Sequence, residues 1–252
     1  MSKIKVLIII PARFNSSRFP GKPLVQIANK SMLERTFLQA QKINEKFEFQ
    51  VYIATDHEKI IEEANRIGAK SIFTESNIQS GTERCFAAAS KINFDFDYMV
   101  NIQGDEPFIL PHQIEELVDA MHDSQAPIAT LCIQLEKQDD LKNSNIVKVV
   151  KNKKNEAMYF SRSIIPFPRN TVVGFSYYKH IGVYAFNKKV IPIMQQLDTS
   201  PLEQIESLEQ LKWLDYGLKI KMVETSHQSP AVDSPEDLLD VENFLKQNPS
   251  FL

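Results

Sequence analysis

The chain begins with a short apolar segment that ends abruptly at a proline. Residues 5–10 read Lys-Val-Leu-Ile-Ile-Ile, and Pro11 follows directly. A run this short, rich in β-branched residues and bounded by proline, is typical of a buried parallel strand. The loop from Pro11 to Leu24 then contains three cations, two serines and a Pro-Gly pair. Because open α/β sheets bind ligands at the carboxyl ends of their strands, we expect this loop to form part of a binding site.

The composition of this loop suits an anionic ligand. Positive charges at Arg13, Arg18 and Lys22, together with backbone N–H groups, match the oxygens of a triphosphate. A solvated basic loop is the alternative. The loop lacks the Gly-x-x-x-x-Gly-Lys-Ser/Thr pattern of a P-loop and the Gly-x-Gly-x-x-Gly pattern of a dinucleotide site. Neither of these familiar phosphate-binding classes is therefore indicated.

Length and charge limit the class of protein. A chain of 252 residues buries one substantial core, with room for a small appended lobe. Its formal net charge of −3 gives no support for nucleic-acid binding, which normally goes with a basic excess. The apolar runs all fall short of the about 20 residues that a membrane span needs. We therefore expect neither a nucleic-acid partner nor a membrane partner.

The cysteines and the N-terminal segment point to the cytoplasm. Cys85 and Cys132 lie far apart in sequence, without metal-ligand spacing and without the pattern of a disulfide framework. The first apolar run is a plausible strand and has no small-residue cleavage site of the kind that ends a signal peptide. We therefore expect a cytoplasmic protein.

Strand and helix patterns alternate through the first half of the chain. Repeated strand–helix alternation predicts an α/β fold with a mainly parallel sheet and helices on both faces. The expected strands are 4–10, 50–54, 70–73 and 98–102, and the expected helices are 32–43, 58–67, 82–92 and 111–121.

The second half has a different pattern. Short strands are expected at 146–151, 157–160 and 180–186, and residues 139–175 read as a lobe inserted against the main sheet. One helix is expected over 201–216, capped by Ser200, with Leu202, Ile205, Leu208 and Leu211 as its buried stripe. A last helix follows Asp233-Ser234-Pro235-Glu236. Without repeats or a linker, residues 1–252 are predicted to form one domain that includes the lobe.

Two aspartates are candidates for metal ligands. Asp105 follows the expected strand 98–102 and a glycine, Gly104, that lets the backbone turn sharply. It would project at the binding edge of the sheet, as a Mg²⁺ ligand does. An ordinary turn explains the same residues equally well. Asp233 precedes the last helix, and its spacing alone favours a helix cap over a metal ligand.

Three further segments have both a functional and a structural interpretation. Residues 79–84 read Gln-Ser-Gly-Thr-Glu-Arg and form a helix-capping pattern. Arg162 has the planar fork that recognises carboxylates, whereas His180 and Tyr184 are of types that are more often structural in a strand. The helix at 201–216 has a polar face that could be simply solvated. Local pattern alone does not decide between the two interpretations.

Taken in order along almost the whole chain, these segments resemble the 3-deoxy-manno-octulosonate (Kdo) cytidylyltransferase family. The resemblance rests on Ser-Ser-Arg-Phe-Pro-Gly-Lys-Pro-Leu at 16–24, Gln-Ser-Gly-Thr-Glu-Arg at 79–84, Gln-Gly-Asp-Glu-Pro at 103–107, Tyr-Phe-Ser-Arg at 159–162, Lys-His-Ile-Gly-Val-Tyr at 179–184, the helix at 200–211 and Val-Asp-Ser-Pro-Glu-Asp-Leu at 232–238. It implies a Rossmann-like, GT-A-like nucleotidyltransferase fold, a three-layer sandwich with a small inserted lobe.

The resemblance also implies roles for individual residues. The catalytic residues are Arg13, Lys22 and Asp105. Contacts to the nucleotide CTP are implied for Pro11, Ala12, Arg13, Arg18, Lys22, Ser80, Gly81 and Arg84. Contacts to the sugar are implied for Gln103, Arg162, His180, Tyr184, Glu209 and Gln210. Mg²⁺ is the implied cofactor, with Asp105 and Asp233 as its ligands, and a homodimer is the implied assembly.

The implied reaction is transfer of CMP from CTP to the anomeric 2-hydroxyl of Kdo, with release of pyrophosphate, for lipopolysaccharide biosynthesis. The sugar itself stays open, because the segment 168–179 is shorter than in many relatives and Ser-Pro-Ala at 229–231 replaces a glycine-rich stretch. The alternatives are the 8-amino analogue of Kdo or another acidic sugar, and a non-catalytic nucleotide-binding regulator. Both metal carboxylates are retained, which argues against the regulator.

Overall fold

The computed structural model describes residues 3–15, 19–78, 80–136, 138–170, 172–227, 230, 232 and 235–251. The chain divides into two compact units, one formed by Met1–Glu115 with Ser229–Leu252 and the other by Glu116–Gln228. The second unit is much wider than the lobe expected at 139–175. The boundary falls inside a single helix, α4 (Pro111–Ser124).

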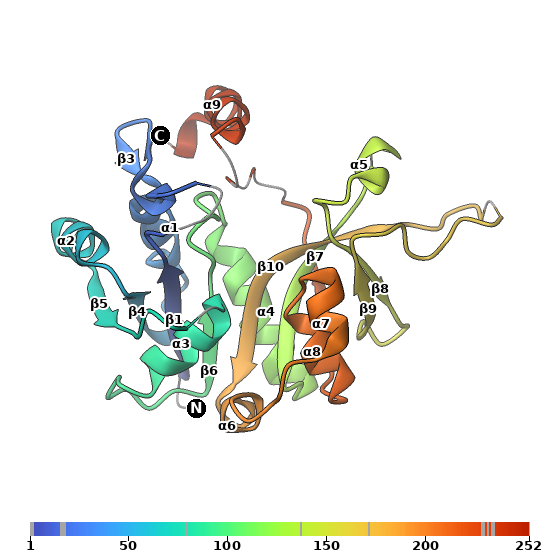
Figure 1. The fold of residues 1–252 in the computed structure, drawn as a ribbon, viewed down its shortest axis with the longest axis horizontal. Coiled ribbons are helices and arrows are strands. Elements are labelled where there is room, and N and C mark those ends of the chain that lie inside the picture. The colour runs from blue at the N-terminus through green and yellow to red at the C-terminus, as the bar shows by residue number, and fades with distance from the viewer. Residues whose placement is uncertain are drawn as a thin grey trace. The chain divides into compact units, whose positions relative to one another are not determined.

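The first unit is built on four parallel strands in the order β6–β1–β4–β5 (Figure 1). The strands are β1 (Ile4–Ala12), β4 (Phe47–Thr55), β5 (Lys70–Phe73) and β6 (Tyr98–Asn101). β1 lies between β4 and β6, and residues 6–10 of β1 have no exposed surface. All four expected strands are confirmed. The apolar run of β1 is of the kind that is stable where helices cover both faces of the sheet.

The connections of the first unit are helical, as the alternating pattern predicted. They are α1 (Met32–Ala40), α2 (Glu58–Arg66) and α3 (Gly81–Ala89), with a one-turn 3₁₀ helix η1 (Lys22–Leu24) before them. The side chains of Ser31, His57 and Ser80 cap the three α-helices by accepting backbone N–H groups. A small hairpin of β2 (Gln26–Ile27) and β3 (Lys30–Ser31) precedes α1.

The second unit has a mixed sheet. β10 (Tyr178–Asn187) runs antiparallel to β7 (Ile128–Gln134), and β11 (Ile220–Glu224) runs parallel to β7. β8 (Lys148–Lys151) pairs with β10 and with β9 (Ala157–Ser161). β8, β9 and β10 confirm the expected strands, whereas β7 and β11 have no counterpart in the sequence prediction.

The prediction of one helix over residues 201–216 is wrong. The structure has two short helices, α7 (Pro201–Glu206) and α8 (Gln210–Asp215), because Ser207 between them adopts a left-handed conformation with φ 52°. Leu208 is buried as expected, but Ile205 is 83% exposed, because the break turns the first helix away from the core. The remaining helices of this unit are α5 (Gln138–Lys142), η2 (Lys188–Val190) and α6 (Ile191–Met194). No helix among the described residues has the length and apolar character to span a lipid bilayer.

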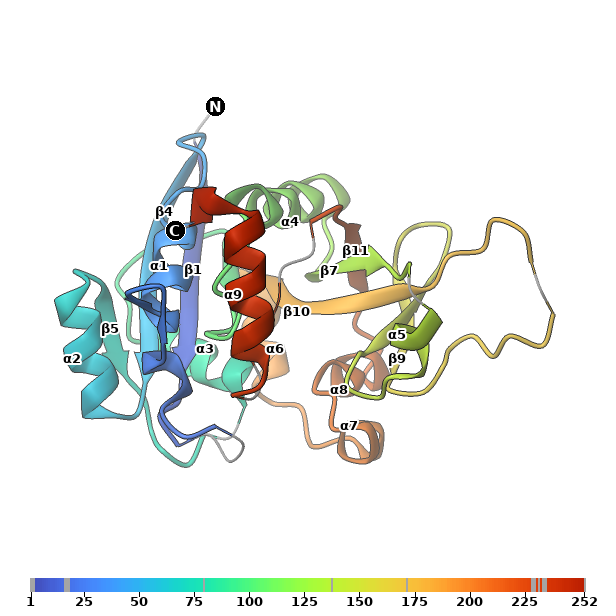
Figure 2. The same cartoon turned by 90° about the horizontal axis from the view of Figure 1, so that it is seen from above.

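The C-terminal segment packs on the first unit through an aromatic cluster. α9 (Asp237–Gln247) and η3 (Pro249–Phe251) supply Phe244 and Phe251, whose ring centroids lie 5.0 and 5.6 Å from that of Phe108. Phe108 has no exposed surface and belongs to a core cluster with Met32 and Val241. Figure 2 shows α9 lying over the strands of this unit. The cluster therefore joins the two ends of the chain that form the unit.

Replacing Phe108 by alanine is expected to lower the free energy of unfolding by about 3 to 5 kcal/mol, because a fully buried ring leaves a cavity that its neighbours fill only partly. Urea denaturation measures the loss. Phe73→Ala is the matched control, since that ring is 52% exposed. Equal, small losses in the two variants would contradict the described packing.

Candidate active site

A cleft of about 470 Å³ opens at the carboxyl ends of β1 and β6 in the first unit. Parallel strands bring their following loops to one edge of the sheet, so loops distant in sequence meet there. The lining residues are Pro11, Ala12, Arg13, Asn15, Lys22, Pro23, Gly81, Gln103, Gly104 and Asp105. The cleft thus gathers residues from the loop after β1, the start of α3 and the loop after β6, three of the segments that the sequence singled out.

Lys22 and Asp105 form an ion pair in this cleft. The Nζ atom of Lys22 lies 2.8 Å from Oδ2 of Asp105, and the two side chains are 13% and 29% exposed. Lys22 opens η1 directly after Gly21, whose φ of 73° makes the turn that brings the loop back. The Gly21 N–H donates to the carbonyl of Phe14, and the Phe14 ring stacks on His57 at 4.1 Å. The described ends of the loop are therefore held by backbone and ring contacts.

Two glycines let the backbone segments of the cleft approach closely. A Cβ on Gly104 would lie 3.1 Å from the carbonyl oxygen of Pro11, tighter than ordinary contact. A Cβ on Gly81 would lie 3.0 Å from Oε1 of Gln103. The side chain of Gln103 in turn donates to Asn101, which donates to Thr82. β1, the loop after β6 and the start of α3 therefore lie so close together that there is little room for a side chain at position 81 or 104.

Arg84, predicted to contact the nucleotide, is wholly buried. Its guanidinium donates to Oγ1 of Thr74 at 2.5 Å, to Oδ2 of Asp56 at 3.0 Å and to the carbonyl of Ile78 at 3.1 Å. These bonds tie α3 to the ends of β4 and β5. The nucleotide contact of Arg84 stays a prediction, and the structure gives this side chain a role in holding the loop before α3. Ser80 likewise caps α3 by accepting the N–H groups of Thr82 and Glu83.

Two predicted residues, Arg18 and Asp233, lie outside the described residues. Val232, the residue before Asp233, is described and has no exposed surface. Its N–H donates to the carbonyl of Asp105 at 3.4 Å. Val232, which directly precedes the predicted metal ligand Asp233 in the sequence, therefore contacts the backbone of the other predicted ligand, Asp105.

The second unit contains most of the residues predicted to bind the sugar. Arg162 follows β9, and its guanidinium donates to the carbonyls of Glu206 at 2.8 Å and Ser144 at 3.1 Å. Glu209 and Gln210 lie at the start of α8. Gln210 is 3% exposed, and its Nε2 is buried with no hydrogen-bond partner among the described residues. A buried amide without an acceptor is what a bound ligand would complete.

His180 and Tyr184 lie on β10 and are almost completely enclosed, with 9% and 2% exposure. Nε2 of His180 lies 3.0 Å from Oγ1 of Thr130, and the Thr130 hydroxyl is also within hydrogen-bond distance of the backbone carbonyls of Ile181, at 3.1 Å, and Val183, at 2.8 Å. Burial lowers the pKa of His180 to about 3 and raises the pKa of Tyr184 well above its usual value. Both side chains are neutral near pH 7.

Comparison with known proteins agrees with this geometry. The model of a cytidylyltransferase family matches residues 7–220. The 3-deoxy-manno-octulosonate cytidylyltransferase of Thermodesulfovibrio yellowstonii is 42% identical over 95% of this chain and 97% of its own length. The enzyme of the same name from Escherichia coli is 39% identical over 96% and 97%. This chain belongs to the 3-deoxy-manno-octulosonate cytidylyltransferase family.

Solved structures place this family member in the expected fold. A CMP:2-keto-3-deoxy-manno-octonic acid synthetase complexed with CTP superposes with a TM-score of 0.90 at 38% identity, covering 96% of this chain and 99% of that one. A cytidylyltransferase from Leptospira borgpetersenii has a TM-score of 0.60 at 17% identity and shares the fold alone. The predicted α/β nucleotidyltransferase fold is confirmed, and the chain is a nucleotidyltransferase.

Some residues of the candidate site were not predicted from the sequence. Asn15 and Pro23 line the cleft, and their place in the loop from Pro11 to Leu24 was the available signal. Lys148 and Glu206 hold Arg162 in the second unit. Lys148 had no signal in the sequence, whereas Glu206 lies in the matched segment 200–211 but was given no role. Their partners come from segments distant in sequence, and a pattern of neighbours does not reveal such contacts.

The burial of His180 predicts how the stability of the protein depends on pH. Because its folded pKa is lowered, the unfolded chain binds the proton first, and the stability that the neutral ring gives is lost as pH falls below about 6.5. The stability difference between the wild type and His180→Gln is expected to shrink by about 2 kcal/mol between pH 8 and pH 5.

Urea denaturation at several pH values measures this difference, with replacement of the exposed His122 by glutamine as the matched control. A difference that is the same at pH 8 and pH 5 would contradict a neutral, enclosed His180.

Proposed function

We propose that this chain transfers CMP from CTP to the anomeric 2-hydroxyl of Kdo, releasing pyrophosphate, for lipopolysaccharide biosynthesis. One observation carries the proposal. Arg13, Lys22 and Asp105 meet in a cleft at the carboxyl ends of β1 and β6 in a member of this family. Cations and one acid at that edge suit a triphosphate and its metal ion.

The reaction is a displacement at phosphorus. The oxygen of the sugar hydroxyl attacks the α-phosphorus of CTP in line. The bond from that phosphorus to the oxygen that bridges it to the β-phosphate breaks and releases pyrophosphate, and the hydroxyl proton passes to solvent water. Arg13 and Lys22 offset the negative charge that builds on the phosphate oxygens in the transition state. Lys22 is available for this role once the triphosphate competes with Asp105 for its ammonium group.

The residues present fit a magnesium ion. Magnesium is typically held by one or two carboxylates together with phosphate oxygens and waters. Asp105 supplies one partly exposed carboxylate. We assign Asp233 as the second ligand, supported by the bond from Val232 to Asp105. The bound ion would polarise the α-phosphate and lower the pKa of the attacking hydroxyl.

Residues of the second unit bind the acidic sugar in this proposal. The guanidinium of Arg162 recognises the carboxylate, for which its planar fork is well shaped. The unpaired amide of Gln210 supplies a donor to a sugar oxygen. His180 and Tyr184 are enclosed, and their contacts to the sugar stay a prediction. We also place the enzyme in the cytoplasm, supported by two buried cysteines that form no disulfide.

Pyrophosphate release with CTP and Mg²⁺, with and without Kdo, tests the function. Release is expected to depend on Kdo and to stop with EDTA. Asp105→Ala is expected to lower kcat by about a hundredfold or more, because the metal and Lys22 lose their shared carboxylate. Asp97→Asn is the matched control, since Asp97 is exposed and accepts only a backbone N–H of β1.

The outcomes separate the alternatives. Release with the 8-amino analogue or with another acidic sugar, but not with Kdo, would change the substrate and keep the reaction. CTP binding without release for any acidic sugar would favour the non-catalytic regulator. Near-normal turnover of Asp105→Ala would contradict the assignment of Asp105 as a ligand of the magnesium ion.

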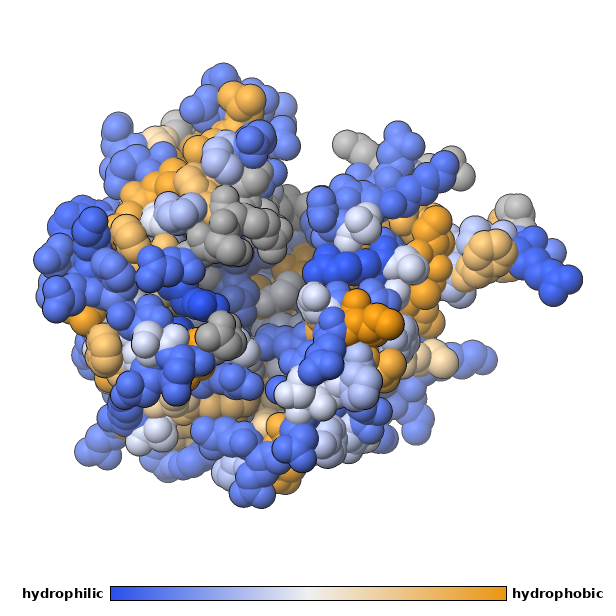
Figure 3. Space-filling view, viewed as in Figure 1, coloured by the Kyte–Doolittle hydropathy of each residue, from blue (hydrophilic) through white to orange (hydrophobic). Residues whose placement is uncertain are grey.

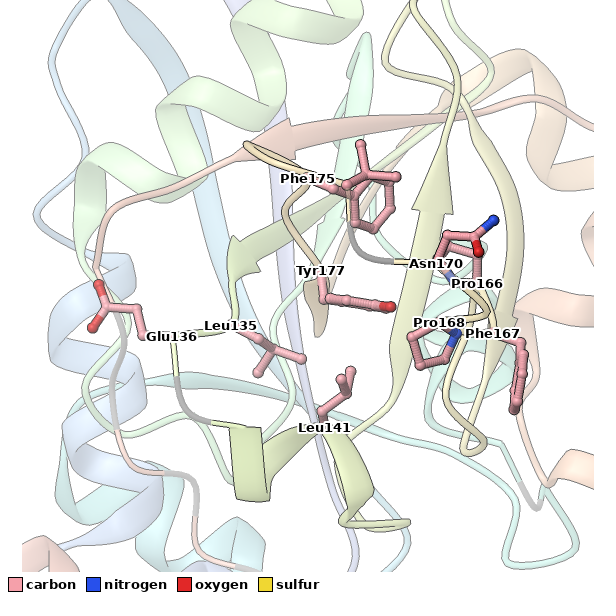
Figure 4. Close-up of a pocket in the computed structure, with 10 residues that line it drawn as sticks. Leu135, Glu136, Leu141, Pro166, Phe167, Pro168, Asn170, Phe175 and Tyr177 are labelled. Carbon is pink, nitrogen blue, oxygen red and sulfur yellow. The ribbon is translucent and has the colours of Figure 1, made fainter.

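We further propose that the protein is a homodimer, joined through the connection between β9 and β10. This connection extends beyond the strands (Figure 1), and Figure 3 shows apolar surface gathered on and beside it. Phe167 and Val173 on it are 80% and 98% exposed. The same segment lines a cavity of about 640 Å³, into which Leu141 and Tyr177 point (Figure 4). A segment that offers both a cavity and apolar side chains suits pairing with a second copy of itself.

Val173→Asp is expected to convert the dimer to a monomer, because it places a charge in the proposed interface without touching the core of the protomer. Light scattering after size-exclusion chromatography measures the mass. Leu239→Asp, at a 67% exposed position on α9, is the matched control. A wild-type monomer, or a Val173→Asp dimer, would rule out this interface.

A further inference from the structure

Glu206, the last residue of α7, accepts three hydrogen bonds from two consecutive residues. Its Oε1 accepts from the hydroxyl of Ser161 at 2.5 Å, and its Oε2 accepts from the backbone N–H of Arg162 at 2.9 Å. Its own carbonyl accepts from Nε of Arg162 at 2.8 Å. Side chain and backbone of one residue therefore bind the end of β9 at three points, 44 or 45 residues away in sequence.

Arg162 is also held from its other side. Its carbonyl accepts from Nζ of Lys148, which has no exposed surface and donates to the carbonyl of Ile146 at 2.7 Å as well. Burial lowers the pKa of Lys148, and the negative charge of Glu206 opposes this shift. Both polar groups of the Arg162 backbone are thus paired, one with Glu206 and one with Lys148, so the residue has little freedom to move.

The guanidinium of Arg162 keeps donors for a ligand. It has five N–H groups, and three of them donate to carbonyls, those of Glu206, Ser144 and Ser207. The carboxylate of Glu206 binds the backbone N–H of Arg162 and the hydroxyl of Ser161. Backbone carbonyls therefore orient the positive charge of the guanidinium, and N–H groups remain for the carboxylate of a substrate.

The same contact sets the position of α8. Directly after Glu206 the chain turns through Ser207, with φ 52°, and α8 begins at Gln210. The N–H groups of Ser207 and Leu208 both donate to the carbonyl of Glu203, which ends α7. Gln210, whose buried Nε2 has no partner among the described residues, is therefore four residues from the point at which Glu206 docks on β9.

We propose that Glu206 is a positioning residue for the acidic sugar, which holds the guanidinium of Arg162 and the start of α8 in one fixed arrangement. The proposal rests on the proposed function of Arg162 and Gln210 in sugar binding. Glu206 itself contacts no substrate. Its effect is felt through Arg162, so its loss should weaken sugar binding and leave the nucleotide cleft of the first unit unchanged.

Steady-state kinetics of Glu206→Ala provides the first test. The KM for the sugar is expected to rise about tenfold or more, as the loss of hydrogen bonds to a charged group predicts, while the KM for CTP stays the same. The sugar KM of Glu206→Gln should fall between those of the wild type and Glu206→Ala. The amide oxygen of glutamine still accepts from one of the two donors, the Ser161 hydroxyl or the Arg162 N–H. Gln204→Ala, at an exposed position of the same helix, is the matched control. Equal increases in both KM values would overturn the proposal, since they would mark a general structural defect.

A double-mutant cycle with Arg162→Ala provides the second test. If Glu206 acts through Arg162, adding Glu206→Ala to Arg162→Ala is expected to raise the sugar KM by less than twofold more. Independent, multiplying effects would overturn the proposal.

Exchange of the backbone amide proton of Arg162, followed by NMR in the protein without substrates, separates this inference from the proposed function. This N–H donates to Oε2 of Glu206, so its exchange is expected to be slow in the wild type and at least tenfold faster in Glu206→Ala, whichever sugar the enzyme uses. Unchanged exchange would overturn the positioning role, whereas absent turnover of Kdo with faster exchange would overturn the substrate alone.

Discussion

The parallel register of β1 between β4 and β6 is the constraint on which the first unit depends. β1 pairs with β4 along its full length, from Ile4 to Ala12, and with β6 through residues 6–9. This pairing brings the loops after β1 and β6 to one edge, where a Cβ on Gly104 would lie 3.1 Å from the Pro11 carbonyl. An apolar strand buried on both faces cannot slip by one residue without exposing or distorting its neighbours. The register therefore fixes where the loops after β1 and β6 begin.

Within that cleft, the pair of Lys22 and Asp105 balances charge before substrates arrive. A partly buried carboxylate without a cation nearby would be costly, and the ammonium 2.8 Å away offsets that cost. In the proposed complex, a triphosphate with its metal ion would supply both charges that the pair needs: anionic oxygens for Lys22 and a cation for Asp105. Binding thus exchanges one set of ionic contacts for another. The second unit follows the same logic, because Arg162 is oriented by carbonyls and keeps its charge for a ligand.

Local sequence signals predicted the elements that depend on neighbouring residues, and failed where distant contacts decide. The strand of residues 4–10, the capped starts of α1 and α3, and the residues gathered in the cleft follow from apolar runs, caps and glycines. The break at Ser207 does not, because Ser200, Pro201 and the leucine spacing all favour a continuous helix, whereas the docking of Glu206 on Ser161 and Arg162 ends it. Arg84 is buried by its bonds to Asp56 and Thr74, two residues from other elements. β7, Ile-Ala-Thr-Leu-Cys-Ile-Gln, is a mostly apolar run that was not assigned as a strand from the sequence.

The central claim is that the cleft after β1 and β6 is the nucleotide site of this cytidylyltransferase. A crystal structure of the protein with CTP and Mg²⁺ tests it most directly. The account predicts the triphosphate against Arg13 and Lys22, with the metal ion on Asp105 and the ammonium of Lys22 moved from that carboxylate to a phosphate oxygen. A triphosphate bound elsewhere, or a metal ion that leaves the Lys22–Asp105 pair intact, would contradict the account.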